Sequence, residues 1–153
     1  MKYLHTMIRT SNLEKTIDFF CNKMGLIEIR RHKNEAGKFT LVFLCAPEDI
    51  QDNNNKIIKS PLIEITYNWP DSAGNIEKLS YGRNFGHLAF SVDNIYDYCE
   101  KLIKNGVTIN RPPRDGYMAF IKSPDNISIE ILQKDTPLER CEPWASMPNN
   151  GTW

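Results

Sequence analysis

The sequence predicts an α+β fold made of two tandem β-α-β-β-β modules, because one pattern of strands and helix occurs twice. Each copy opens with a histidine at the head of a strand, His5 in the first and His87 in the second. Each copy then carries a helical pattern that stops at a glycine, and it closes on a strand with a central glutamate, Glu64 or Glu130. The matched beginnings and ends indicate a duplicated module.

Polar segments set the predicted boundaries of the modules. The first module covers residues 1–68 and the second covers residues 84–134, joined by the polar linker 69–83. We expect the two modules to form a single domain, with a curved mixed sheet around one site. Residues 135–153 are rich in proline and tryptophan, which predicts an extended tail that lies on the domain surface.

In the first module, apolar spacing predicts a helix that begins at the capping sequence of residues 11–14 and ends at Gly25. Alternation in the first strand places His5 and Arg9 on one face. Residues 46–60 contain a run of asparagines and are expected to form a solvated loop. Strands are expected at residues 4–10, 26–32, 39–45 and 61–67.

The second module repeats this order. Asp93 is the expected N-cap of its helix, which ends at Gly106. In its last strand, alternation lets Ile129 and Ile131 pack on the helix while Glu130 faces away. Strands are expected at residues 87–92, 107–110, 117–122 and 127–133.

Composition excludes several classes of partner. The 19 lysines and arginines balance the 19 aspartates and glutamates, so the chain lacks the basic surface that nucleic acid or an anionic membrane requires. No segment approaches the roughly 20 apolar residues of a membrane span, and no signal-peptide pattern is present, so we expect a cytoplasmic protein. The 4 cysteines are widely spaced and form no C-x-x-C pair, which favours reduced, mostly buried thiols.

The two strand-embedded glutamates, each matched with a histidine, point to a metal site. A single glutamate that faces away from a strand's apolar side is usually solvated, but a histidine and a glutamate at matched places in both copies favour an enclosed site. Two imidazoles and two carboxylates suit zinc, nickel, cobalt or iron rather than calcium or a thiolate zinc site. The candidate ligands are His5, Glu64, His87 and Glu130.

The repeat and its motifs resemble the vicinal oxygen chelate superfamily, which has the glyoxalase/bleomycin-resistance fold, and within it the glyoxalase I family. The resemblance covers about residues 1–134, and it implies that the four candidate ligands bind one divalent metal ion per site. A glutamate at position 64 favours the glyoxalase branch, because many other members use two histidines and only one glutamate. The most specific motifs are residues 64–69, 83–87 and 123–125, followed by Ile129-Glu130.

The resemblance implies a lactoylglutathione lyase, which would convert the methylglyoxal-glutathione hemithioacetal to S-lactoylglutathione through a metal-stabilised enediolate. It also implies that Glu130 is the catalytic base, with Glu64 able to serve the other face of the hemithioacetal. Family positions that bind glutathione correspond to Arg9, Asn68 and Arg83. The loop of residues 111–117 is shorter than in well-known bacterial members, so the identity of the thiol is the open part of this prediction.

The short chain resembles the bacterial type, which implies nickel or cobalt as the favoured metal, with zinc as an alternative. In bacterial members the modules pair between chains, so the resemblance implies a homodimer whose two sites are shared between subunits. Two alternatives use the same fold: another enzyme of the superfamily, such as a dioxygenase or a thiol transferase, and a non-catalytic binding protein of the bleomycin-resistance type. Glu64 and Asn68 argue against the first, and the intact ligand set argues against the second.

Overall fold

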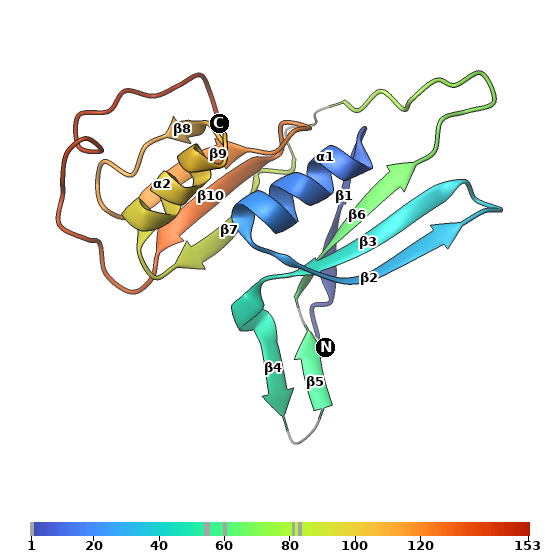
Figure 1. The fold of residues 1–153 in the computed structure, drawn as a ribbon, viewed down its shortest axis with the longest axis horizontal. Coiled ribbons are helices and arrows are strands. Elements are labelled where there is room, and N and C mark those ends of the chain that lie inside the picture. Colours follow the sequence, from blue (N-terminus) through green and yellow to red (C-terminus); the bar gives the residue numbers. More distant parts are fainter. Residues whose placement is uncertain (1, 54–55, 60, 81, 83) are drawn as a thin grey trace. The chain divides into compact units, whose positions relative to one another are not determined.

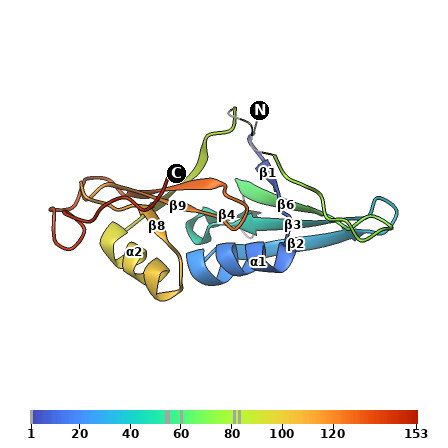
Figure 2. The same cartoon turned by 90° about the horizontal axis from the view of Figure 1, so that it is seen from above.

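A computed structural model describes residues 2–53, 56–59, 61–80, 82 and 84–153 (Figure 1). Contacts within the chain divide it into two compact units, Met1–Tyr81 and Gly82–Trp153. Each unit contains a four-stranded sheet, and Figure 2 shows that the helix of each unit lies on one face of the sheet of that unit.

The first unit has strands β1 (His5–Arg9), β2 (Ile27–Asn34), β3 (Phe39–Cys45) and β6 (Leu62–Asn68) in its main sheet, with the order β1-β6-β3-β2. Strands β1 and β6 are parallel, whereas β3 is antiparallel to both of its neighbours. The sheet is therefore mixed, with the parallel pair at one edge.

The second unit has strands β7 (His87–Val92), β8 (Ile109–Arg111), β9 (Met118–Lys122) and β10 (Ser128–Gln133), with the order β7-β10-β9-β8. Here β7 and β10 are the parallel pair, and β9 is antiparallel to β10 and to β8. Strand order and direction thus repeat those of the first unit. The predicted α+β fold of two β-α-β-β-β modules is confirmed.

The first helix differs from the prediction of a uniform α-helix. Helix α1 (Leu13–Ile17) continues as a π-helix over Asp18–Met24. Asn12 is the N-cap, its side chain accepting a hydrogen bond of 3.0 Å from the backbone N–H of Lys15, and Gly25 ends the helix at a φ of 99°. The wider turns of a π-helix rotate side chains relative to the α-helical spacing. This explains why Cys21 is only partly buried, although the sequence favours mostly buried thiols.

Two other expectations for the modules were wrong. Residues 46–60 are not simply a loop, because a 3-10 turn at Pro47–Asp49 leads into an antiparallel pair, β4 (Ile50–Asn53) and β5 (Lys56–Lys59). Isoleucines, which favour strands, stand on both sides of the asparagine run that predicted the loop.

The second correction concerns the N-cap of helix α2 (Ile95–Lys104), which is Asn94 rather than Asp93. The Asn94 Oδ1 accepts hydrogen bonds from the backbone N–H groups of Tyr96 and Asp97, at 3.0 and 3.2 Å. The Asp93 side chain instead pairs with Lys134, with 3.1 Å between Oδ1 and Nζ. Both residues are good caps, so composition alone does not decide between them.

The core of the second unit lies between α2 and its sheet. Ile129 and Ile131 of β10 are fully buried, as the alternation predicted, and Leu102 of α2 is fully buried as well. Buried Gln133 joins the helix to the sheet, because its side chain accepts from the N–H of Ile95 at 2.9 Å and donates to the carbonyl of Asp93 at 2.8 Å. Glu130 is left on the opposite face of β10, which faces away from the helix.

Four thiols occupy different environments, which predicts a graded reactivity. Cys99 is fully buried on α2, and this burial raises the pKa of its thiol to about 12. Cys141 is exposed. At pH 8 we expect iodoacetamide to alkylate Cys141 in the folded protein and to reach Cys99 only in denaturant, because the thiolate is the reactive form. Peptide mapping by mass spectrometry measures this; rapid native-state labelling of Cys99 would contradict the packing of α2.

Residues 135–153 contain no helix or strand, in keeping with their proline content. Trp144 is buried and stacks on Tyr96 of α2, with 6.2 Å between ring centroids. The tail is therefore packed against the second unit. Among the residues that the structure describes, no helix is long and apolar enough to cross a membrane.

Candidate metal-binding site

Each unit holds one pair made of a histidine and a glutamate. In the first, the Nε2 of His5 lies 2.9 Å from the Oε2 of Glu64. In the second, the Nε2 of His87 lies 3.1 Å from the Oε2 of Glu130. The structure thus brings together the predicted candidates of each module in pairs.

The register of the parallel strands explains both pairs. In the first unit His5 pairs with Leu62 and Met7 pairs with Glu64, so the histidine and the glutamate project from the same face of neighbouring strands. In the second unit His87 is opposite Ser128, two residues before Glu130. The offset is identical in the two units, so the pairs occupy equivalent positions of the repeat.

A phenylalanine completes each pair, and the sequence reasoning did not identify it. Phe43 stands opposite Glu64 in the sheet and meets the His5 ring edge-on, with 5.9 Å between centroids. Phe120 stands opposite Glu130 and meets the His87 ring in the same way at 5.6 Å. These contacts restrict the imidazole orientation. The signal was available, because an apolar strand that contains phenylalanine precedes the closing strand of both modules.

The geometry of both pairs fits adjacent ligands of a divalent metal ion. At bond lengths of about 2.1 Å, two ligands at a right angle are about 3.0 Å apart, whereas tetrahedral ligands are about 3.4 Å apart. The observed separations of 2.9 and 3.1 Å are close to the distances expected between two ligands of one ion. The same separations suit a hydrogen bond between the two side chains in metal-free protein.

Exposure also suits a site that admits a substrate. The carboxylate side chains of Glu64 and Glu130 are 13% and 15% exposed, while the imidazoles of His5 and His87 are 38% and 43% exposed. In the described part of the chain, no three histidine, cysteine, aspartate or glutamate side chains come close enough together to hold a metal ion. Each unit therefore supplies two of the four predicted ligands.

The three predicted thiol-binding residues have different outcomes. Arg9 is exposed at the end of β1, and Asn68 is the last residue of the neighbouring β6. Alternation puts both on the strand face that carries His5 and Glu64. The Asn68 side chain donates a hydrogen bond of 2.7 Å to Glu77. Arg83 lies outside the described residues.

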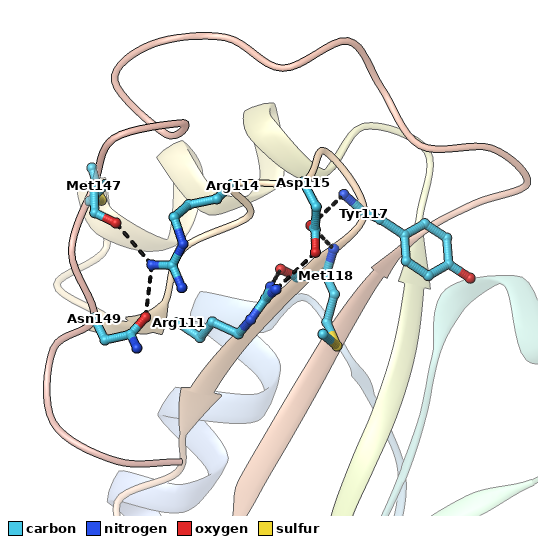
Figure 3. A network of polar contacts seen from close by, with 7 residues as sticks. All are labelled: Arg111, Arg114, Asp115, Tyr117, Met118, Met147 and Asn149. Carbon is cyan, nitrogen blue, oxygen red and sulfur yellow. Dashed lines mark hydrogen bonds and ion pairs between the residues drawn. The ribbon is translucent and has the colours of Figure 1, made fainter.

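The loop of residues 111–117 is held by its own charges (Figure 3). Arg111 forms an ion pair of 2.8 Å with Asp115 and donates to the carbonyl of Met118. Burial alone would raise the pKa of Asp115, but the hydrogen bonds from Arg111 and from the N–H groups of Met118 and Tyr117 lower this pKa to about 2. The charge of Arg111 is thus neutralised within the loop.

Gly116, also in this loop, joins it to the tail. The Gly116 carbonyl accepts a hydrogen bond of 3.0 Å from the N–H of Leu138. Its φ of +69° is one that residues with a side chain rarely adopt.

The chain is thus made of two repeated modules, each presenting a histidine and a glutamate at equivalent positions of its sheet. Residues 2–131 match the family described as Glyoxalase/Bleomycin resistance protein/Dioxygenase superfamily. The chain belongs to this superfamily.

Within the superfamily, the chain is similar to proteins named lactoylglutathione lyase. The Neisseria meningitidis serogroup A protein is 34% identical over 139 residues, which cover 88% of this chain and 91% of that protein. The Escherichia coli O157:H7 protein is 32% identical, with 88% and 93% covered. The solved structure of the trypanothione-dependent glyoxalase I of Leishmania major has a TM-score of 0.71 and 30% identity, with 88% of this chain and 87% of that chain covered. The predicted relationship to glyoxalase I is confirmed.

Proposed function

We propose that the chain is a metal-dependent lactoylglutathione lyase that isomerises the hemithioacetal of methylglyoxal and glutathione to S-lactoylglutathione. The observation that carries this proposal is the pair of equivalent histidine-glutamate sites on matched parallel strands. The names of the relatives support the reaction, and the donor set supports a divalent metal ion.

The ligands of the proposed metal are His5, Glu64, His87 and Glu130. Nickel or cobalt is the favoured ion and zinc the alternative, since imidazole and carboxylate donors accept all three. When bound, the ion supplies positive charge that stabilises the negative charge developing on the two substrate oxygens. The chain's own residues then have to move the proton.

Glu130 is the proposed base. Its carboxylate removes the proton from the carbon that bears the sulfur, leaving an enediolate. The same carboxylic acid then returns the proton to the neighbouring carbon, while the hydroxyl proton passes from the oxygen on the sulfur-bearing carbon to the oxygen on its neighbour, so no proton is gained or lost overall. With 15% of its side chain exposed, Glu130 is shielded from bulk water, which hinders exchange of that proton during the transfer. Glu64 occupies the equivalent place in the first unit and would serve the opposite face of the hemithioacetal.

A homodimer with shared sites completes the proposal. Each unit presents two of the four proposed ligands, so a complete set has to combine one unit of each kind. We propose that His5 and Glu64 of one subunit join His87 and Glu130 of the other. Two equivalent sites follow from the two-fold symmetry of such a dimer.

The proposed thiol is glutathione, whose two carboxylates require cationic and amide partners. Arg9 and Asn68 extend from the ends of β1 and β6 on the ligand face, and Arg83 is the third proposed partner. Arg111 is excluded from this role by its ion pair with Asp115.

Metal removal and reloading test the proposed function. Protein stripped with a chelator should not form thioester from the hemithioacetal, and stoichiometric nickel or cobalt should restore formation, with zinc compared in parallel. Thioester absorbance measures the rate, and elemental analysis measures the bound metal. If the protein binds metal but forms no thioester with any of the three ions, the proposed lyase activity is wrong and another reaction of the superfamily is favoured. Purification without stoichiometric metal would favour a binding protein.

A further inference from the structure

The two units differ in what covers the phenylalanine beside the histidine. In the first unit, the guanidinium of Arg30 lies 3.8 Å from the centroid of the Phe43 ring. In the second unit, the indole of Trp153 stacks on the Phe120 ring, with 5.9 Å between centroids and an interplanar angle of 27°. The histidine-glutamate pair of the first unit is therefore bordered by a cation, and the pair of the second unit is bordered by an aromatic surface.

Register explains how Trp153 reaches this position. Arg30 pairs with Phe43 across the first sheet, and Arg111 pairs with Phe120 across the second, so Arg111 is the equivalent of Arg30. The ion pair with Asp115 holds the guanidinium of Arg111. The space over Phe120 is filled by an indole from the tail instead.

Hydrogen bonds from the second unit hold the tail just before it reaches Phe120. Arg114 donates from Nη1 to the carbonyl of Met147 at 2.9 Å and to the Oδ1 of Asn149 at 2.8 Å, as Figure 3 shows. Asn110 and Asn150 then exchange two hydrogen bonds, of 2.8 and 2.9 Å. These contacts fix the last turn of the tail before Trp153.

The exposed aromatic surface next to Phe120 consequently belongs to the tail. Phe120 is only 8% exposed and contacts both the His87 ring and the Trp153 ring, whereas Trp153 is 42% exposed. Phe120 lies opposite Glu130, so the indole is on the sheet face of the proposed base. An apolar group carried by the substrate next to its reacting carbons would meet this indole.

We infer that Trp153 is a specificity-determining residue that contacts the alkyl or aryl group of the 2-oxoaldehyde, and that Arg114 is a positioning residue that acts through Trp153. This inference rests on the proposed function and deepens it by naming a chemical class of substrate, aldehydes with a planar apolar substituent. The stacking surface favours aryl over methyl substituents.

Binding of two non-reactive thioethers tests the role of Trp153. Titration calorimetry of metal-loaded protein gives the Kd of S-benzylglutathione and of S-methylglutathione for wild type, Trp153→Ala, Trp153→Phe and Arg114→Gln. An aromatic contact corresponds to about 3- to 10-fold in affinity. Trp153→Ala should weaken S-benzylglutathione by about this factor and S-methylglutathione by less than about twofold, and Trp153→Phe should restore most of the loss. Arg114→Gln should give a smaller loss that is again selective for the benzyl compound.

Two results would overturn the inference. One is an unchanged affinity of Trp153→Ala for S-benzylglutathione, and the other is an equal loss for the two thioethers. Thioester formation by the wild-type protein shows whether only the inferred role of Trp153 has failed or the proposed function has failed as well. If wild type is active and the loss is not selective, only the role of Trp153 is wrong; if wild type neither forms thioester nor binds either thioether, both proposals fail.

Discussion

Replacing Glu130 with glutamine is expected to lower the rate of thioester formation by about 10²- to 10⁴-fold, the usual contribution of a positioned general base. Glutamine has nearly the same shape as glutamate, but its amide cannot accept the carbon-bound proton. The packing of β10 should be unaffected, because Glu130 projects from the face opposite the buried Ile129 and Ile131. Steady-state rates with the hemithioacetal as substrate measure the effect.

Glu100→Gln is the matched control, since Glu100 is an exposed residue of α2 whose pairing with Lys104 at 3.9 Å is weak. This control should retain the wild-type rate. Because an amide is also a poorer metal ligand, the metal content of Glu130→Gln is measured and the assay is run at saturating metal. A fully metallated Glu130→Gln protein with wild-type turnover would rule out Glu130 as the base.

Heterodimers made from two inactive variants should regain activity if the sites are shared between subunits. One chain carries His5→Ala and the other carries Glu130→Gln, each with a different affinity tag. In the mixed dimer, both lesions fall in one site and the other site is intact, so about half of the wild-type activity is expected. Tandem affinity purification followed by the thioester assay measures it.

The parent homodimers provide the controls, because each has a lesion in both of its sites and should be inactive. Sites formed within single chains would predict the opposite result. In that case each site of the mixed dimer carries one lesion, and activity should not exceed that of the parents. Such a result would contradict shared sites while leaving the four ligands as candidates.

Duplication made much of the fold predictable from the sequence. Matched histidines and glutamates identified the two modules, and alternation in β10 identified the buried isoleucines. Features without a copy in the other module were harder to predict. Among the described residues, the β4–β5 pair has no counterpart in the second unit, and Asn94 is the N-cap while Asp93 pairs with the distant Lys134.

The histidine-glutamate pairs of the candidate site were predictable because they too are duplicated in the sequence. The two pairs follow from strand register, which period-two alternation encodes. Trp153 was not predictable, because its contact with Phe120 depends on the path of a segment without regular structure. Arg111 illustrates a further limit, since the sequence shows a basic residue in the loop but not its partner, which the structure identifies as Asp115.

Gly116 links the loop of residues 111–117 to the start of the tail at Leu138. A methyl group built at this position would lie 2.1 Å from the carbonyl oxygen of Leu138, which is too close for any adjustment except displacement of the backbone. Since Leu138 is also hydrogen-bonded to Gly116, the loop and the start of the tail must shift together. An insertion in the loop or at the start of the tail would therefore displace the other segment. The lengths of the two segments are thus constrained together.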